Sequence, residues 1–273
     1  MPDLKKAEYR FFFGGHDLEM TEIQALLSEI ELGDRIVDFG LPWGARASAY
    51  QAEITAALLR GETPVLIELE DDLPAGFDRD DIISIDHHGV RAGAERPSAL
   101  RQVYDLVGVN RRLAWTRRRA LVDANDIGHV RALRAMGATP DEVRAIRDAD
   151  RMAQGVSDAT ERESRRAIAA AEHRGALVIV RSSAPTSSAI VDFLLPEYGG
   201  PGADEVLVVM PDKVAFFGRG SVIEDLKSVP GCWYGGALPN FGYWGAMLEG
   251  SSAEEVVERV VAYFDGMSNV VVR

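Results

Sequence analysis

The stretch DIISIDHHG, residues 81–89, joins a short apolar run to two adjacent histidines. Three isoleucines within residues 82–85 indicate a buried strand of a parallel sheet. The run ends in Asp86, His87 and His88, and open α/β sheets carry their chemistry at the carboxyl ends of strands. Aspartate and neutral imidazole are ligands for Mn²⁺, Mg²⁺, Zn²⁺ or Fe²⁺. The stretch therefore predicts a metal site, although two histidines that cap a helix or bond within a loop remain an alternative.

The length of 273 residues allows two ordinary domains or one large one. With 47% hydrophobic and 27% charged residues, the composition is typical of a soluble globular protein. No run of 18 apolar residues occurs, and the first ten residues lack the apolar core of a signal peptide. We therefore expect a cytoplasmic protein with no membrane partner. The single cysteine, Cys232, excludes an internal disulfide.

The net charge of −13 limits the partners of the chain. Proteins that bind long duplex nucleic acid carry basic faces that displace counterions, so we expect no such partner. Arginines cluster within residues 111–119 and 144–151. They could hold a short anionic substrate or form a solvated helix face paired with acids. The charge favours a small ligand held by a metal.

Apolar runs alternate with helical patterns in the first half of the chain. The pattern predicts strands over residues 9–13, 35–39, 65–69 and 82–85, and helices over residues 20–32, 45–60, 97–107 and 113–122. Strands joined through helices by short loops predict a parallel sheet with helices on both faces. The fold class is therefore α/β.

A helical region without strand character follows, and the alternation then restarts. Thr160 with Glu163 forms a capping-box pattern, and Gly175 suits a helix end, which predicts a connector helix. We expect a metal-binding domain over residues 1–155, the connector over 156–175, and a smaller α/β domain over 176–273. In the last domain we expect strands over 176–180, 205–210 and 213–217, helices over 187–195, 221–226 and 253–264, and a glycine-rich stretch over 231–245.

Acidic residues and histidines follow apolar runs in four separate segments. Four of the five histidines lie in them. Several carboxylates with one or two imidazoles are what a two-metal hydrolytic centre needs. The segments are His16-Asp17-x-Glu19, Glu68-x-Glu70-Asp71, Asp86-His87-His88 and Asp123-x-x-Asp126 with His129.

The order of these segments resembles the DHH phosphoesterase superfamily. That superfamily includes RecJ-type exonucleases, nanoRNA and 3′-phosphoadenosine-5′-phosphate phosphatases, cyclic-dinucleotide phosphodiesterases and family II inorganic pyrophosphatases. The C-terminal half resembles the DHHA1 substrate-binding domain, through Arg219 and the stretch WYGGALPNFGYWGA. The resemblance implies an N-terminal DHH domain with a parallel sheet, followed by a DHHA1-like domain that binds substrate.

The resemblance also implies roles for individual residues. His87 would bind metal, His88 would face the substrate phosphate, and Asp86 would orient the imidazole. The implied metal ligands are Asp17, Glu19, Glu70, His87 and Asp126, with His16 and Asp123 as alternatives. Glu70 would bridge two ions. The implied substrate contacts are Arg219, Gly235, Gly236, Asn240 and Tyr243.

The implied activity is hydrolysis of short single-stranded oligonucleotides or small nucleotide phosphates by a metal-bound hydroxide. Two Mn²⁺ ions are expected, with Mg²⁺, Co²⁺ or Fe²⁺ as alternatives. Glu19 and Glu70 stand where the family has aspartates. A nucleotide-binding sensor without turnover is therefore one alternative, and an inorganic pyrophosphatase on the same scaffold is another. Edge strands of the second domain leave a homodimer open.

Overall fold

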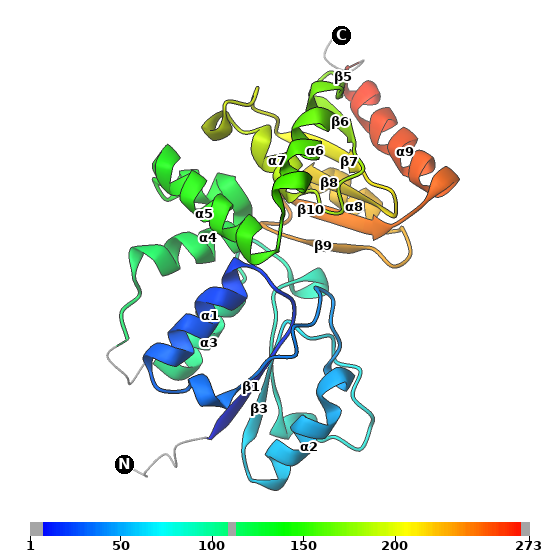
Figure 1. Cartoon of the computed structure of the whole chain (residues 1–273). Helices are drawn as coiled ribbons and strands as arrows, with labels where there is room; N and C mark the ends of the chain where they lie inside the picture. Colours follow the sequence, from blue (N-terminus) through cyan, green and yellow to red (C-terminus); the bar gives the residue numbers. More distant parts are fainter. Residues whose placement is uncertain (1–7, 109–112, 269–273) are drawn as a thin grey trace. The chain divides into compact units, whose positions relative to one another are not determined.

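The computed structural model describes residues 8–108 and 113–268 (Figure 1). The chain divides into two compact units, the first formed by Met1–His87 and Pro97–Asp123, the second by His88–Arg96 and Ala124–Arg273. The expected boundaries at residues 155 and 175 stay predictions. Arg111 and Arg112 of the first arginine cluster lie outside the described residues.

The first unit is built on a four-stranded sheet in which every strand is parallel to its neighbour. The strand order is β2-β1-β3-β4. The strands are β1 (Tyr9–Phe13), β2 (Ile36–Val37), β3 (Thr63–Ile67) and β4 (Ile83–Ile85). Both central strands are buried, as expected where helices cover both faces of a parallel sheet. The prediction of an N-terminal parallel sheet is confirmed.

Helices cover both faces of this sheet, with α1 and α3 on one side and α2 on the other (Figure 1). Tyr50 and Ile54 on the α2 side pack with Phe12 and Leu66 of the sheet, and all four are almost fully buried. The elements are α1 (Leu18–Glu29), a 3-10 turn (Ala47–Tyr50) leading into α2 (Gln51–Leu59), and α3 (Ala99–Gly108). Helix α4 (Arg117–Ala135) begins in this unit and continues into the second.

Several boundaries in the first unit differ from the sequence prediction. The strand expected over residues 35–39 has only two residues, and β3 ends at Ile67, two residues early. The helix expected over residues 113–122 begins at Arg117 and continues to Ala135. The polar stretch DANDIGH, which follows the predicted helix, is helical until Gly128 and His129 depart from helical dihedral angles.

The second unit contains a six-stranded mixed sheet of order β5-β6-β7-β8-β10-β9. Only β6 and β7 pair in parallel, and the other pairs are antiparallel. The strands are β5 (Glu172–Arg174), β6 (Leu177–Arg181), β7 (Glu205–Val209), β8 (Lys213–Arg219), β9 (Trp233–Gly235) and β10 (Phe241–Met247). The helices are α5 (Pro140–Ala153), α6 (Asp158–Ala169), α7 (Ser188–Phe193), α8 (Gly220–Leu226) and α9 (Gly250–Ser268).

The connector helix is shorter than expected. Ser157, rather than Thr160, caps α6 by accepting a hydrogen bond from the backbone N–H of Thr160, and the helix ends at Ala169. Residues 172–174 then form β5, and Gly175, with φ of 60°, lies in the turn between β5 and β6. A left-handed turn position favours glycine as much as a helix end does, so the sequence signal was ambiguous.

The glycine-rich stretch forms two strands that the sequence did not predict. A Cβ atom on Gly245 would lie 2.5 Å from the ring of Trp233, and one on Gly235 would lie 2.5 Å from the hydroxyl of Tyr243. Each aromatic ring therefore lies over a glycine of the neighbouring strand, which explains why glycine is tolerated here. Trp244 is fully buried and donates from Nε1 to the carbonyl of Leu226.

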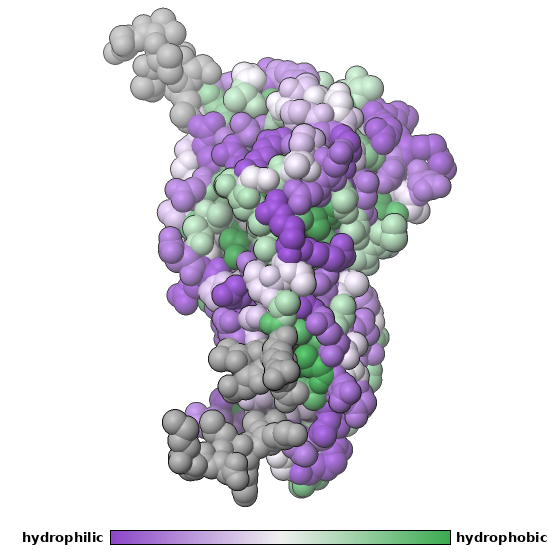
Figure 2. Space-filling model, turned by 90° about the vertical axis from the view of Figure 1, so that its left-hand side faces the viewer, coloured by the Kyte–Doolittle hydropathy of each residue, from purple (hydrophilic) through white to green (hydrophobic). Residues whose placement is uncertain are grey.

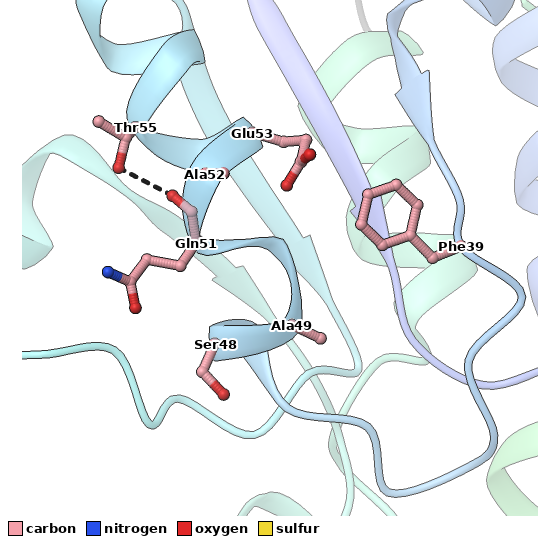
Figure 3. Close-up of a pocket in the computed structure, with 7 residues that line it drawn as sticks. All are labelled: Phe39, Ser48, Ala49, Gln51, Ala52, Glu53 and Thr55. Carbon is pink, nitrogen blue, oxygen red and sulfur yellow. Dashed lines mark hydrogen bonds between the residues drawn. The ribbon is translucent and has the colours of Figure 1, made fainter.

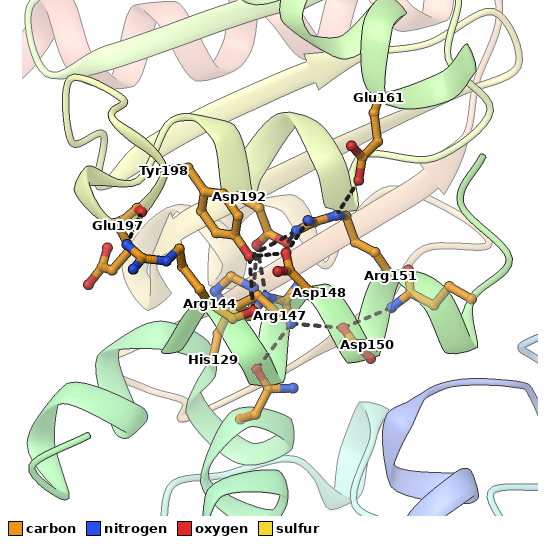
Figure 4. A network of polar contacts seen from close by, with 12 residues as sticks. His129, Arg144, Arg147, Asp148, Asp150, Arg151, Glu161, Asp192, Glu197 and Tyr198 are labelled. Carbon is orange, nitrogen blue, oxygen red and sulfur yellow. Dashed lines mark hydrogen bonds and ion pairs between the residues drawn. The ribbon is translucent and has the colours of Figure 1, made fainter. Parts of the chain in front are cut away.

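A buried polar network joins α5 and α7 in the second unit (Figure 4). Asp192 is fully buried and pairs with both Arg147 and Arg151. Arg147 also bonds to Asn125 and Asp150. These groups satisfy one another's charge and hydrogen bonds, which buried ionic groups require.

Hydrophilic residues predominate on the face shown in Figure 2, where hydrophobic residues gather in small groups. Among the described residues, none of the helices combines the length and apolarity needed to cross a bilayer.

Candidate metal centre

The chain that leaves β1 passes very close to the end of β3. The backbone N–H of Gly14 donates to the carbonyl of Ile67 at 2.9 Å. A Cβ atom on Gly14 would lie only 2.3 Å from the carbonyl oxygen of Glu68. A side chain at this position would force the backbone to shift, so glycine is strongly favoured here. This close approach brings the start of α1 toward the residues that follow β3.

Helix α1 places the first carboxylate. Asp17 caps the helix by accepting a hydrogen bond from the backbone N–H of Met20 at 2.9 Å. Glu19 lies in the first turn, where the helix dipole favours negative charge. Its side chain is 2% exposed, and Oε1 accepts a hydrogen bond from the backbone N–H of Leu100 at 2.7 Å.

Glu68 supplies the second carboxylate from a strained backbone position. It follows β3 with φ of 51°, a left-handed conformation that costs a residue with a side chain about 1–2 kcal/mol. Its N–H donates to the carbonyl of Ile85 at 2.8 Å, which holds the backbone against the end of β4. Such strain clusters at functional sites, where the surrounding structure maintains it.

His87 follows β4 and meets both carboxylates. Its Nε2 atom lies 3.1 Å from Oε1 of Glu68 and 3.7 Å from Oε2 of Glu19. One ligand atom from each of the three residues lies within 4.8 Å of the other two, and all three side chains are buried. Three strand ends of one parallel sheet thus bring two carboxylates and an imidazole together.

The electrostatics of this cluster suit a cation. Burial raises the pKa of Glu19, but His87 and the N–H of Leu100 outweigh it, so the pKa of this carboxyl lies below its usual value. Burial raises the pKa of Asp123, and the nearby Glu19 raises it further. Among the described residues, Oε2 of Glu19 and Oδ1 of Asp123 are buried without a hydrogen-bond partner.

Carboxylate and imidazole are suitable donors for Mn²⁺, Mg²⁺ or Fe²⁺, and a bound cation would offset the surplus of buried negative charge. The residues present therefore fit a divalent metal.

Glu70 is not part of this cluster. Its side chain is 60% exposed and pairs with Arg46 at 3.3 Å. The structure therefore does not support the expectation that Glu70 bridges two ions, because Glu68 lies beside His87 instead. The reason is the early end of β3, which makes Glu68 the first residue beyond the strand. The sequence signal for Glu68 was its position as a polar residue that interrupts the apolar run VLIEL.

The remaining predicted residues of the first unit have other surroundings. Asp17 acts as the helix cap described above, and His16 is exposed. The backbone carbonyl of Asp86 accepts a hydrogen bond from the side chain of Gln102. The predicted orienting role of the Asp86 carboxylate stays a prediction. Asp123 is a member of the first unit, with Glu19 and His87 among the charges that affect its pKa.

Asp126 belongs to the second unit, although it lies three residues after Asp123 in α4. Residues at this spacing share one face of a helix. The choice between Asp123 and Asp126 as a ligand therefore stays open.

Two predicted substrate contacts are neighbours within the second unit. The rings of His88 and Tyr243 lie 6.4 Å apart, and the N–H of Ala94 donates to the carbonyl of Leu238. The segment after His88 is thus attached to the glycine-rich hairpin. Gly235 lies under Tyr243, while the carbonyl of Asn240 accepts from the N–H of Gly220.

The other two predicted contacts are fixed by local structure. Arg219 donates from Nε to the buried carboxylate of Glu205 at 2.6 Å. Gly236 has φ of 96°, a conformation that favours glycine.

No protein-family model and no curated protein matches the sequence. Among solved structures, the fold is similar to PggH, a pGpG-specific phosphodiesterase from Vibrio cholerae, with 12% identity and a TM-score of 0.39, over 95% of this chain and 99% of that one. It is also similar to RecJ from Thermus thermophilus in complex with Mn²⁺, with 13% identity and a TM-score of 0.49. That match covers 96% of this chain and 53% of that one, so the chain spans about half the length of this RecJ.

An exonuclease RecJ bound to manganese is similar as well, with 13% identity and a TM-score of 0.41, over 96% of this chain and 91% of that one. RecJ-type exonucleases are among the DHH phosphoesterases that the sequence resembles. Each of these TM-scores lies below 0.5.

Proposed function

We propose that this protein is a divalent-metal-dependent phosphoesterase that hydrolyses short oligonucleotides or small nucleotide phosphates. The observation that carries the proposal is the buried group of Glu19, Glu68 and His87 at the carboxyl ends of parallel strands. Such a group is costly to bury without a cation. The order of motifs that resembles DHH phosphoesterases supports the choice of phosphoester hydrolysis.

In this proposal Glu19, Glu68 and His87 hold the metal, with Mn²⁺ as the first candidate. Asp123 or Asp126 adds a further carboxylate. A bound divalent ion would lower the pKa of a water ligand and offset charge on the phosphoryl oxygens. His88 would donate a hydrogen bond to a phosphate oxygen, and Tyr243 beside it would contact the rest of the substrate.

Two details of the first unit support precise positioning of these ligands. The Leu100 N–H fixes one oxygen of Glu19, which leaves the other directed to His87. The strained backbone of Glu68 is held by its hydrogen bond to Ile85. Ligands held by such bonds need little reorganisation when an ion binds.

The proposal is tested by hydrolysis of a substrate panel with metal-stripped protein resupplied with Mn²⁺. The panel contains 3′-phosphoadenosine-5′-phosphate, a dinucleotide, a pentanucleotide, a cyclic dinucleotide and pyrophosphate. His87→Ala is compared with His173→Ala, whose histidine is exposed on β5 of the second unit. We expect Mn²⁺-dependent cleavage of a nucleotide by the wild type and by His173→Ala, and none by His87→Ala.

Full activity of His87→Ala would refute the proposal. Cleavage of pyrophosphate alone would favour the pyrophosphatase alternative. Tight nucleotide binding with no cleavage at any Mn²⁺ concentration would favour the sensor alternative.

A further inference from the structure

The loop that follows β2, residues 38–44, is attached to the strand that leads into the candidate metal centre. The hydroxyl of Tyr50 donates to the carbonyl of Phe13 at 2.8 Å and accepts from the N–H of Phe39 at 3.0 Å. Tyr50 is fully buried, so this link is shielded from water. It joins the loop to the end of β1, four residues before Asp17.

A second contact joins the same loop to the residues just before α1. A Cβ atom on Gly15 would lie 2.7 Å from the Cα atom of Trp43, so the two backbones are in close contact. Because β1 and β2 are parallel neighbours, the loop lies at the same edge of the sheet as Glu19, Glu68 and His87.

This loop exposes two large aromatic side chains. Phe39 is 51% exposed and Trp43 is 42% exposed. The ring of Phe39 stacks on Tyr50, with centroids 4.5 Å apart and an interplanar angle of 27°. Tyr50 thus covers one face of the Phe39 ring and fixes its orientation, while the exposed part of the ring is accessible to a ligand.

Beside Phe39 the surface forms an open depression of about 670 Å³, bounded by the start of α2 (Figure 3). Gln51 and Glu53 line it, and Figure 3 shows the Glu53 carboxylate directed toward the side on which the Phe39 ring lies. A flat aromatic ring and a carboxylate in one depression combine a stacking surface with a hydrogen-bond acceptor. The volume of the depression is within the range of small-molecule sites.

We propose that this depression binds a nucleobase of the substrate, with Phe39 as the stacking platform. This inference rests on the proposed function and names the chemistry that the first unit would recognise. Base stacking on aromatic rings accepts any base. Glu53 adds selectivity, because a carboxylate only accepts hydrogen bonds. Guanine presents two adjacent N–H donors that match both carboxylate oxygens, whereas uracil presents one N–H between two carbonyls.

The test compares Phe39→Ala with Leu59→Ala, in which a more exposed hydrophobic side chain at the end of α2 is removed. On a guanine dinucleotide with Mn²⁺, we expect KM to rise about tenfold or more for Phe39→Ala, from the loss of base stacking, and to stay within about twofold for Leu59→Ala. Phe39→Trp should retain the wild-type KM. Glu53→Gln should reduce the ratio of kcat/KM between guanine and uracil dinucleotides.

Calorimetric titration with guanosine 5′-monophosphate, in the absence of metal, keeps this test separate from the test of catalysis. We expect binding by the wild type and by His87→Ala, and weaker binding by Phe39→Ala. Equal binding or equal KM for Phe39→Ala and the wild type would overturn the inference and leave the proposed function intact. An active His87→Ala would refute the proposed function instead.

Discussion

Replacing Glu68 with glutamine removes one negative charge from the buried cluster and keeps the size of the side chain. Glu70→Gln is the matched control, because the same chemical change occurs two residues later on an exposed side chain. The resemblance to the DHH phosphoesterases implies Glu70 as a bridging ligand, whereas Oε1 of Glu68 lies 3.1 Å from Nε2 of His87. The two variants therefore separate the two assignments.

The expected magnitude follows from the burial of Glu68. Two unit charges about 4 Å apart interact by about 4 kcal/mol at an effective dielectric constant of about 20, and a divalent ion strengthens the interaction. Glutamine keeps one oxygen as a ligand, so we expect a loss of about 3 kcal/mol in the free energy of Mn²⁺ binding. This loss corresponds to a Kd for Mn²⁺ that is about 100-fold higher. Glu70 pairs with Arg46 at the surface, and such pairs contribute about 0–1 kcal/mol, so its replacement should change Kd by less than about fivefold.

Isothermal titration of the metal-stripped variants with Mn²⁺ measures both values directly. We expect a Kd about 100-fold higher for Glu68→Gln and nearly unchanged for Glu70→Gln. Circular dichroism and urea unfolding confirm that both variants remain folded. A large effect of Glu70→Gln with little effect of Glu68→Gln would refute the reasoning.

Three further predictions concern the fold that supports the site. Asp192→Asn should destabilise the protein by about 3–5 kcal/mol, because it removes the fully buried carboxylate that pairs with both Arg147 and Arg151. Asp204→Asn, at a side chain that is 73% exposed, should cost under about 1 kcal/mol. Equal costs of the two substitutions in urea unfolding would contradict this prediction. Arg10 holds the pKa of Glu62 at about 2, against the opposing effect of burial and with help from Arg60. Because the folded pKa is depressed, Glu62 stabilises the protein above its usual pKa of 4.5, and this contribution is lost as the pH falls toward 2. Glu62→Gln should therefore be less stable than the wild type by about 1–2 kcal/mol at pH 7, a value reduced because the partner arginines are partly exposed. This difference in stability should shrink below about pH 5. A difference in thermal stability that does not change with pH would count against this prediction. Gly14→Ala should destabilise the protein by about 1–3 kcal/mol and weaken Mn²⁺ binding, because the added Cβ meets the carbonyl of Glu68. Gly76→Ala places its Cβ in open space and serves as the control. Equal thermal stability and equal Mn²⁺ affinity of the two variants would argue against the close approach at Gly14.

The sequence predicted the features that depend on local pattern. The buried runs of β1 and β3 and the acid–histidine end of β4 were readable because apolar residues with polar residues directly behind them mark strand ends. The same pattern placed Glu19 and His87 among the predicted metal ligands, and their role as ligands stays a prediction. The parallel order of the sheet followed from strands alternating with helices.

Features that depend on tertiary contacts could not be predicted from the sequence. The choice of Glu68 over Glu70 depends on where β3 stops pairing with β1, and two residues decide which carboxylate is buried. Strands β9 and β10 were missed because glycine disfavours strands unless a ring from the next strand covers it, as Trp233 covers Gly245. The β5 strand was missed because Glu172–Arg174 is fully polar and reads as the end of a helix.

The most direct test of the metal assignment is a crystal structure of the protein soaked with Mn²⁺, with anomalous scattering measured to locate the ion. We predict an anomalous peak within coordination distance of the Glu19 and Glu68 carboxylates and of Nε2 of His87. A peak beside Glu70, or a manganese-saturated protein with no ion at these three side chains, would contradict the assignment.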